Sequence, residues 1–256
     1  MTRNVSAPEA EIPAALDRSG AAPVGGLTLE SFAGAPRVNA WIYERLGGVS
    51  GDVLEIGSGI GNLSRFIVRD ARTAFLTDVE PEYVGALRRE FGALGDRVRV
   101  ETWNLDTPPP TTLAGQQFDT IVAVNVIEHI RNDVEAVQRL SALLRPGGTL
   151  LIYVPAGQWV FGSLDAALGH YRRYSRSSLT RLIQQSGLEM TPPRYMNRLG
   201  LVGWFLSGRV LRRRVLSAVM VTLFDQIVGI ARVIDAIFAP LPLGLGLVTR
   251  ARKPRA

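Results

Sequence analysis

The chain of 256 residues contains no cysteine, two histidines and a single lysine, Lys253, among its 29 basic residues. The absence of cysteine excludes disulfide bonds, thiol chemistry and metal sites with thiolate ligands. The histidines and acidic residues show no spacing along the chain that is typical of metal ligands, so the sequence predicts no metal. Residues 1–26 lack the basic start and apolar core of a signal peptide, and their composition predicts a flexible leader of a cytoplasmic protein.

Residues 27–256 are long enough to form a single domain with one large core, and the hydrophobic content of 46% agrees with this. The net charge of +6 raises the question of a nucleic-acid partner. However, the basic residues are spread along the chain and do not alternate with aromatic residues as they do on base-stacking surfaces. We therefore expect no nucleic-acid partner.

A glycine-rich turn follows the first predicted strand, because residues 52–61 read DVLEIGSGIG. Gly57, Gly59 and Gly61 have the spacing G-x-G-x-G, which differs from the G-x-G-x-x-G of dinucleotide-binding folds. Residues 62–68 then carry apolar side chains at the spacing of a helix lying on a sheet. Glycines in such a turn let a ligand approach the backbone closely or permit a positive φ. The order strand, glycine turn and helix therefore predicts a ligand-binding turn.

Four further strands are predicted downstream, over 72–77, 97–103, 118–124 and 149–154. The first of them ends at Asp78, where α/β folds that bind nucleosides place an acid for the ribose hydroxyls. The strand over 118–124 is almost continuously apolar, as expected for a strand that helices cover on both faces.

Four blocks of the sequence resemble class I S-adenosylmethionine (SAM) methyltransferases: the glycine turn, the acid Asp78, NVIEHI at 125–130 and RPGG at 145–148. The resemblance covers about 52–156 strongly and the rest weakly. It implies an α/β fold, a doubly wound, Rossmann-like sheet of seven mostly parallel strands. The last two strands are expected near 188–196 and 245–252.

The same resemblance implies that SAM is the cofactor and S-adenosylhomocysteine the product. Asp106 would receive the adenine amino group, and Asp78 would accept hydrogen bonds from the ribose. The complete predicted cofactor-binding set is Glu55, Gly57, Ser58, Gly59, Gly61, Asp78, Val79, Asn104, Leu105, Asp106, Asn125 and Val126.

The segment 156–176, which follows the fifth strand, is dense in aromatic and basic residues. Loops at the carboxyl ends of parallel strands usually carry function, so we predict that this segment contacts the acceptor through Trp159, Tyr171, Arg172 and Arg173. His170 is the preferred general base, since histidine accepts a proton near neutral pH. A structural hydrogen bond is the alternative role. His129 is a second catalytic candidate, and its alternative role is to line the cofactor pocket or hold the turn.

A helical insertion is predicted over 199–240, between the last two strands. Its apolar residues form one stripe at helical spacing: Val219, Leu223, Ile227, Ile230, Ile234 and Ile237. Charged residues interrupt it short of the roughly 18 to 20 apolar residues that a membrane-spanning helix needs. Four interpretations remain open: helices packed on the core, a lid over an apolar acceptor, a dimer contact, and a membrane face whose cluster Arg212 to Arg214 meets anionic lipid.

The sequence thus predicts a SAM-dependent methyltransferase, a monomer or homodimer, that acts on a small and partly apolar acceptor. Natural-product, lipid and sugar intermediates are the favoured acceptors, and O-methylation is the favoured reaction. Two alternatives remain: C-methylation of a quinone- or isoprenoid-type acceptor, and a SAM-binding cyclase or isomerase that transfers no methyl group.

Overall fold

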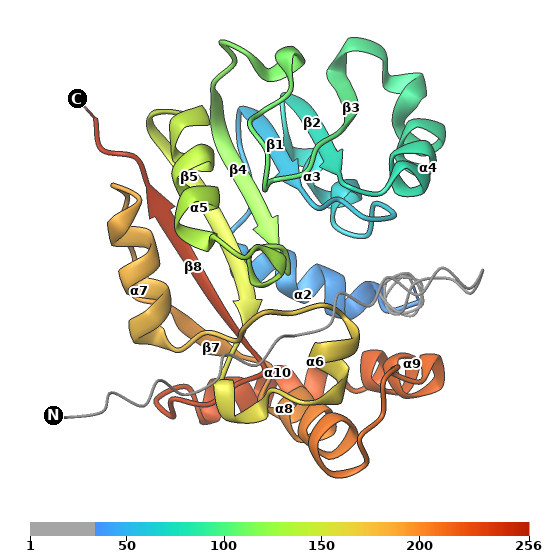
Figure 1. Cartoon of the computed structure of the whole chain (residues 1–256). Helices are drawn as coiled ribbons and strands as arrows, with labels where there is room; N and C mark the ends of the chain where they lie inside the picture. The colour runs from blue at the N-terminus through green and yellow to red at the C-terminus, as the bar shows by residue number, and fades with distance from the viewer. Residues whose placement is uncertain (1–33, 256) are drawn as a thin grey trace, which may run out of the picture.

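The computed structural model describes residues 34–255, so the expected leader 1–26 lies outside the described residues. One mixed sheet lies at the centre, with helices on both faces (Figure 1). The strands are β1 (Asp52–Ile56), β2 (Thr73–Asp78), β3 (Val98–Thr102), β4 (Phe118–Val124), β5 (Leu144–Pro155), β6 (Glu189–Met190), β7 (Arg194–Met196) and β8 (Gly246–Arg252). Their order is β3-β2-β1-β4-β5-β8-β6, and β7 pairs with β8 beside β6. The first five strands are parallel and β8 is antiparallel to β5, which confirms the doubly wound, mostly parallel fold.

The sheet has eight strands where seven were expected, because the strand predicted over 188–196 is split in two. Pro192 and Pro193 lie at the break. Proline has no N–H to donate to the ladder, and its ring fixes φ, so two consecutive prolines end regular pairing. Thr191 still donates its N–H to Arg250 O at 3.0 Å, just before the break. The two short pieces therefore pair with β8 separately.

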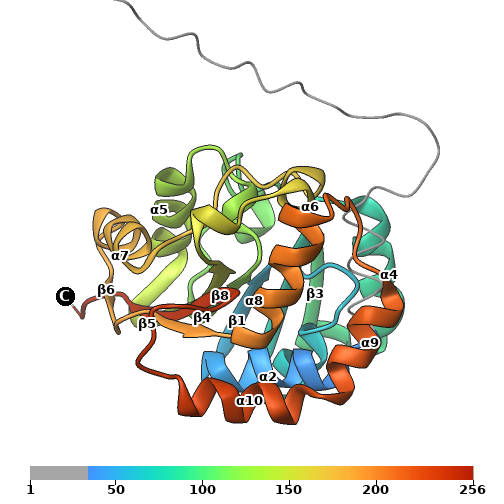
Figure 2. The same cartoon turned by 90° about the horizontal axis from the view of Figure 1, so that it is seen from below.

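Helices cover the two faces of the sheet as separate layers (Figure 2). One face carries α5 (Asp133–Leu143) and α7 (Arg176–Gln185), and the other carries α2 (Pro36–Leu46), α3 (Ser64–Asp70) and α4 (Pro81–Phe91). Successive strand residues alternate between the two cores, since Val53 joins one and Leu54 the other. The single-turn and irregular helices are η1 (Gly92–Arg97), η2 (Thr111–Leu113), η3 (Ile127–His129), η4 (Gln158–Val160) and the π-helix η5 (Leu206–Val210).

The helix α2 was not predicted from the sequence, although its local signals are present. Pro36 occupies its first turn, where the missing N–H costs nothing. Val38, Trp41 and Ile42 follow at helical spacing and are buried.

The remaining helices form the insertion and its neighbour. The helices α8 (Arg198–Phe205), α9 (Ala218–Gln226) and α10 (Val228–Ile237) follow β7, and the short α6 (Ser163–Ala167) precedes α7. The helix α9 packs on α2, α10 packs on α8, and α6 contacts η5. Figure 1 shows these helices together at the end of the sheet where the parallel strands finish.

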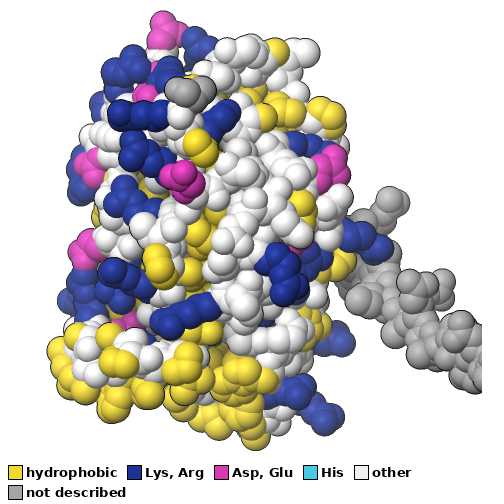
Figure 3. All heavy atoms as spheres, turned by 90° about the vertical axis from the view of Figure 1, so that its left-hand side faces the viewer, with side chains coloured by type: hydrophobic (Ala, Val, Ile, Leu, Met, Phe, Trp, Pro, Cys, Tyr) yellow, Lys and Arg dark blue, Asp and Glu magenta, His cyan; other side chains and the backbone are white. Residues whose placement is uncertain are grey.

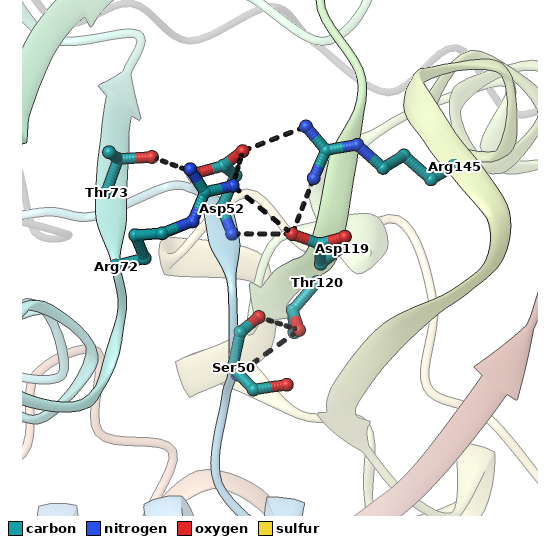
Figure 4. Close-up of polar contacts among 7 residues, drawn as sticks. All are labelled: Ser50, Asp52, Arg72, Thr73, Asp119, Thr120 and Arg145. Carbon is teal, nitrogen blue, oxygen red and sulfur yellow. Dashed lines mark hydrogen bonds and ion pairs between the residues drawn. The ribbon is translucent and has the colours of Figure 1, made fainter.

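An ionic cluster fixes the opposite, amino-terminal edge of the sheet (Figure 4). The Asp52 N–H donates to Asp119 Oδ2 at 2.8 Å, and Arg145 pairs with Asp119 at 2.5 Å and with Asp52 at 2.8 Å. Arg72 also pairs with Asp52, at 2.5 Å. The cluster ties the starts of β1, β4 and β5 together. It leaves the carboxyl edge for a ligand, where open α/β sheets bind theirs.

Candidate active site

The carboxyl ends of β1, β2, β4 and β5 open into one cavity of about 540 Å³. This volume lies in the range of small-ligand pockets. Residues from the loops after these strands line it, together with parts of α2 and α8.

Eleven of the twelve predicted cofactor-binding residues line this cavity, and Gly61 is the exception. A Cβ at Gly61 would lie 3.3 Å from the ring of Phe91 and 3.4 Å from Leu87, so this glycine allows the turn to pack on α4. The other residues come from β1, β2, β4 and the loop after β3, which only the fold brings together.

Gly57 begins the glycine turn with φ at +67°, in the left-handed region. A Cβ at this position would lie only 2.5 Å from Val126 Cγ2, which belongs to the turn after β4. Both the backbone conformation and the contact therefore require glycine. The turn and the segment after β4 approach each other closely at one wall of the cavity.

Asp78 is buried and its carboxylate is fixed by two backbone donors. Oδ2 accepts the Gly59 N–H at 2.7 Å and Oδ1 accepts the Glu80 N–H at 3.0 Å. Burial raises the pKa of this carboxyl, while the N–H groups of Glu80 and Gly59 oppose the rise. Each oxygen keeps a further lone pair, so the carboxylate can still accept hydrogen bonds from a diol. The residues present therefore fit the nucleoside part of SAM.

His129 and His170 line the same cavity and contact each other. Their ring centroids are 4.7 Å apart, with the planes at 87°. Burial, with the neighbouring charge of His170, lowers the pKa of His129 to about 4, so this ring is neutral near pH 7. The pair joins η3, after β4, to the segment between α6 and α7.

Asp165, which the sequence analysis did not select, orients His170. His170 Nδ1 lies 2.9 Å from Asp165 Oδ1, and Arg173 Nε donates to the same oxygen at 2.7 Å. The Trp204 indole N–H and the Gly162 N–H donate to Oδ2 at 3.2 and 3.0 Å. Although burial alone would raise the pKa of Asp165, the hydrogen bond from His170 and the charge of Arg173 hold it below its ordinary value. An ionised Asp165 accepts the Nδ1–H, which leaves the lone pair of His170 on Nε2.

Glu128 lies fully buried beside the histidine pair. Burial raises the pKa of its carboxyl to about 7, while His170 opposes the rise. Its backbone C=O accepts the Tyr171 N–H at 2.8 Å, so the two loops are joined at this residue. Ligand atoms of Glu128, His129 and His170 all lie within 4.8 Å of one another. The expectation of no metal rested on spacing along the chain, which does not show this cluster.

Of the four predicted acceptor-binding residues, only Arg173 lines the cavity. Arg172 pairs with Asp133 at 2.7 Å and donates to Arg131 O at 2.7 Å. The Tyr171 ring is exposed and lies under the guanidinium groups of Arg131 and Arg172. Trp159 is exposed beside Phe205, with ring centroids 5.7 Å apart. These three residues lie around the cavity and outside its lining.

Lining residues contributed by α2 and α8 were not predicted from the sequence. Val38, Asn39 and Ile42 of α2 and Trp204 of α8 complete the walls. The apolar spacing of α2 would have revealed a helix, but no local signal places it over this cavity. Trp204 and Asp165 are 39 residues apart and meet only in the fold.

The helical insertion turns its apolar stripe toward the outside of the molecule. Of the 18 large hydrophobic side chains that are exposed among residues 34–255, 14 lie between 202 and 243. We call them the outer face: Val202, Leu206, Val210, Leu211, Val219, Met220, Leu223, Ile227, Ile230, Val233, Ile237, Phe238, Leu241 and Leu243. Figure 3 shows hydrophobic side chains gathered at the end of the molecule where Figure 1 places α8 to α10. Most of the predicted stripe is therefore not core.

The two acidic residues of the insertion face inward. Asp225 accepts the Val38 N–H at 2.8 Å, and Asp235 accepts those of Asn197 and Arg198 at 2.7 and 3.0 Å. These N–H donors lie at the starts of α2 and α8, where backbone N–H groups have no acceptor within their own helix. The carboxylates thereby fix the orientation of α9 and α10, and the apolar side chains are left outside.

The cavity lining includes no residue from 206 to 243, so α9 and α10 do not form a lid over the cavity as it stands. Only α8 reaches both places: Trp204 lines the cavity, and Val202 on the same helix belongs to the outer face. Among the described residues 34–255, no helix is long and apolar enough to cross a membrane.

A family model described as "Methyltransferase domain" matches residues 54–150. "Polyketide methyltransferase ustM" of Ustilaginoidea virens is 33% identical over 131 residues, 46% of this chain and 30% of that protein. "Non-reducing polyketide synthase mapC" of Penicillium roqueforti is 34% identical over 109 residues, 39% of this chain and 4% of that protein. The chain thus spans less than a third of the length of these two relatives. A "Probable S-adenosylmethionine-dependent methyltransferase" of Mycolicibacterium smegmatis is 29% identical over 187 residues, 72% of this chain and 69% of that protein.

Solved structures show the same fold at low sequence identity. The N-methyltransferase NodS from Bradyrhizobium japonicum, in complex with S-adenosylhomocysteine, has a TM-score of 0.55 at 14% identity and covers 85% of this chain and 86% of its own. The [4+2]-cyclase SpnF has a TM-score of 0.57 at 19% identity, with 86% and 82% covered. The chain has the fold of the class I SAM-dependent methyltransferases. Its residues 54–150 match the methyltransferase domain of that family.

Proposed function

We propose that the protein binds SAM in the cavity at the carboxyl ends of β1, β2 and β4 and transfers its methyl group to a small, partly apolar acceptor. The observation that carries this proposal is the convergence of eleven separately predicted residues on one cavity. The glycine turn would approach the cofactor through its backbone, and Asp78 would accept the ribose hydroxyls. Asp106 and Asn104 lie at the same cavity, where they would meet the adenine.

Bound SAM supplies an electrophilic methyl group on a sulfonium. The residues of the chain would align the acceptor with that methyl group and exclude water, which is the main requirement of an in-line displacement. His170 is the residue that we assign to the acceptor, with O-methylation favoured. Its Nε2 lone pair is available because Asp165 holds Nδ1, and its ring lines the cavity. The His129 ring packs against the His170 ring and is the second catalytic candidate at this position.

Two relatives named for polyketide synthesis support an acceptor that is small and largely apolar. The apolar part of the lining agrees, since Val38, Ile42, Leu168 and Trp204 all contribute to it. C-methylation of such an acceptor, or of a quinone- or isoprenoid-type molecule, is the alternative reaction.

We further propose that the outer face docks on the surface of an anionic membrane. Both acids of the insertion are buried, so the charged side chains exposed on it are arginines: Arg209, Arg212, Arg213, Arg214 and Arg232. Of these, Arg232 is ion-paired with Glu44 of α2. Arginines around an apolar face are complementary to anionic lipid, at about 1 kcal/mol for each residue near the surface. Because α8 reaches both the outer face and the cavity, an acceptor dissolved in the bilayer would enter past α8.

Methyl transfer is tested by incubating the protein with methyl-labelled SAM and apolar extracts of cells that express it. The proposal expects labelled product and an equal amount of S-adenosylhomocysteine. A SAM-dependent conversion of acceptor without S-adenosylhomocysteine would instead indicate a cyclase or isomerase. The structural likeness to SpnF makes that outcome worth measuring.

Membrane docking is tested by flotation with vesicles of phosphatidylglycerol and phosphatidylcholine, against vesicles of phosphatidylcholine alone. We expect the protein to float with the anionic vesicles and to be released by salt. If the protein floats with neither kind of vesicle and forms a concentration-dependent dimer, the outer face is a contact between two copies, and the proposal of membrane docking is wrong.

A further inference from the structure

Three side chains with metal-binding atoms meet beside the cavity and have no assigned role as a group. Glu128 and His129 lie in η3 after β4, and His170 lies in the segment between α6 and α7. Their ligand atoms lie within 4.8 Å of one another. Two imidazoles and one carboxylate form a donor set that binds divalent first-row metals in proteins.

Glu128 is the observation that points to a ligand. Its side chain is completely buried, and neither carboxylate oxygen has a hydrogen-bond partner among the described residues. An ionised carboxylate in such a place is costly unless an opposite charge or donors compensate it. Arg173 is the nearby cation: its Nε and Nη1 are bound to Asp165 and Ala156 O, while its Nη2 is buried without a hydrogen-bond partner among the described residues. Glu128 and Asp165 thus share one guanidinium, and a bound metal cation would supply a second positive charge to the two carboxyl groups.

His170 is held in the orientation that metal-binding histidines commonly adopt. His170 Nδ1 lies 2.9 Å from Asp165 Oδ1, and the Asp165 carboxylate is in turn hydrogen-bonded to Arg173 and Trp204. A carboxylate on one ring nitrogen fixes the tautomer, so that the other nitrogen can bind a metal. The second ring, His129, contacts it at 4.7 Å between centroids.

We propose that Glu128, His129 and His170 bind one divalent first-row metal ion, such as Zn²⁺, Fe²⁺ or Mn²⁺, at the edge of the cavity. Donors at about 2.0 to 2.2 Å from one ion lie about 3 to 3.5 Å apart, so the three side chains would close on the ion by about 1 Å. Three protein ligands leave coordination positions open. His129 and His170 line the cavity, so these positions would be reached from it.

The ion would bind an oxygen of the acceptor, and this part of the inference rests on the proposed methyl transfer. Coordination lowers the pKa of a hydroxyl group, so that its proton passes to solvent. The oxygen then forms the new C–O bond as the C–S bond of SAM breaks, and neutral S-adenosylhomocysteine leaves. His170 would act as a ligand in this scheme, and deprotonation would not require it as a base.

The test measures the metal directly, without SAM or acceptor. The full chain, freed of any affinity tag, is analysed for bound metal by mass spectrometry, then treated with chelator and titrated with Zn²⁺, Mn²⁺ and Co²⁺. We expect one ion per chain, a visible Co²⁺ spectrum, and at least 100-fold weaker binding in Glu128→Gln and His170→Gln. Asp165→Asn, which keeps all three ligands, should weaken binding 10- to 100-fold. The exposed Glu135→Gln is the matched control and should bind like the wild type.

Two results would overturn the site: no saturable binding by the folded wild type, or equal affinity in Glu128→Gln. Either would indicate that Glu128 interacts with Arg173 in a purely ionic network. Titration of SAM into each variant confirms that it is folded. It also separates this failure from a failure of the proposed function, because SAM binding and methyl transfer by metal-free protein would survive.

Discussion

The methyltransferase domain and the helical insertion use amphipathic helices in opposite senses. In α5, the apolar residues Ala136, Val137 and Leu140 face the sheet and are completely buried. In α10, Ile230 and Ile237 are exposed while Asp235 is 3% exposed. The difference teaches that an apolar stripe identifies a helix face but not its partner. In the insertion, the unpaired backbone N–H groups at the starts of α2 and α8 need hydrogen-bond acceptors. Asp225 and Asp235 supply them, so the acidic face of the insertion turns inward.

The largest expected effect is on turnover and belongs to the cavity. His170→Gln should lower the rate of methyl transfer by roughly 10²- to 10⁴-fold, since the residue handles the acceptor either as base or as metal ligand. SAM affinity, measured by calorimetry, should stay close to that of the wild type. His129→Gln is the matched variant. If it alone is inactive with normal SAM affinity, the two histidines must exchange roles.

Next in size is the effect of the inward-facing acids on stability. Asp235→Ala leaves the N–H groups of Asn197 and Arg198 without their acceptor and the Arg198 guanidinium without its ion pair of 3.2 Å. We expect the free energy of unfolding in urea to fall by about 3 to 5 kcal/mol. Asp235→Asn, which keeps one oxygen acceptor, should lose less. A loss below about 1 kcal/mol for Asp235→Ala would show that this carboxylate does not fix the orientation of α10.

A third prediction concerns the pH dependence of stability. Burial raises the pKa of Glu55 from 4.5 to about 7, although Ser64 Oγ donates to it at 2.5 Å. The folded state thus holds the Glu55 proton more tightly than the unfolded state. The contribution of this proton to the free energy of unfolding is complete below pH 4.5 and is lost as the pH rises through about 7. The loss is at most about 3 kcal/mol. Urea titrations across this range should show a flatter curve for Glu55→Gln than for the wild type, and parallel curves would contradict the assignment.

Removal of the Asp78 carboxylate should weaken cofactor binding. Asp78→Ala loses the acceptor that the ribose hydroxyls would use and frees the Gly59 and Glu80 N–H groups. The expected cost is about 1 to 3 kcal/mol, or up to about a hundredfold in the dissociation constant for SAM. Calorimetric titration measures it, with Asp106→Ala as the companion variant. Unchanged affinity would remove Asp78 from the site.

The smallest effect on stability, with a large effect on docking, is expected on the outer face. Leu223→Gln with Ile230→Gln should change the free energy of unfolding by about 0.5 kcal/mol or less, because both side chains are more than half exposed. The same pair should abolish flotation with anionic vesicles. A strong loss of stability would mean that the outer face packs against another part of the protein or a second copy.

The cofactor-binding residues of the cavity could be predicted because the sequence signals that mark them are local. The turn at Gly57 and Gly59 and the acid Asp78 each follow a strand, and parallel strands bring their carboxyl ends to one edge. The group of Asp165, His170, Arg173 and Trp204 could not be predicted in the same way. Asp165 lies in α6 and His170 and Arg173 follow in the next segment, but Trp204 lies in α8, and nothing near Asp165 in the sequence indicates a partner 39 residues away.

The helices α8 to α10 lie between β7 and β8, but the orientation of the insertion could not be derived from periodicity. Spacing placed Ile227 and Ile230 on one face and the acids elsewhere, which the structure confirms. Which face is buried depends on Val38 in α2 and on Asn197 before α8, to which the acids are hydrogen-bonded. These contacts span up to 187 residues.

The most direct test measures methyl transfer in the cavity and docking of the outer face in one assay. The wild type and the Leu223→Gln, Ile230→Gln double variant are given SAM and apolar cell extract, incorporated in anionic vesicles or dispersed in detergent, and S-adenosylhomocysteine is measured. We predict that the wild type turns over in both, whereas the variant loses activity with vesicles and keeps its detergent activity and SAM affinity. If the variant is as active as the wild type on vesicles, the outer face does not deliver the acceptor. If SAM binds and neither protein forms S-adenosylhomocysteine under either condition, the cavity is not that of a methyltransferase acting on such molecules.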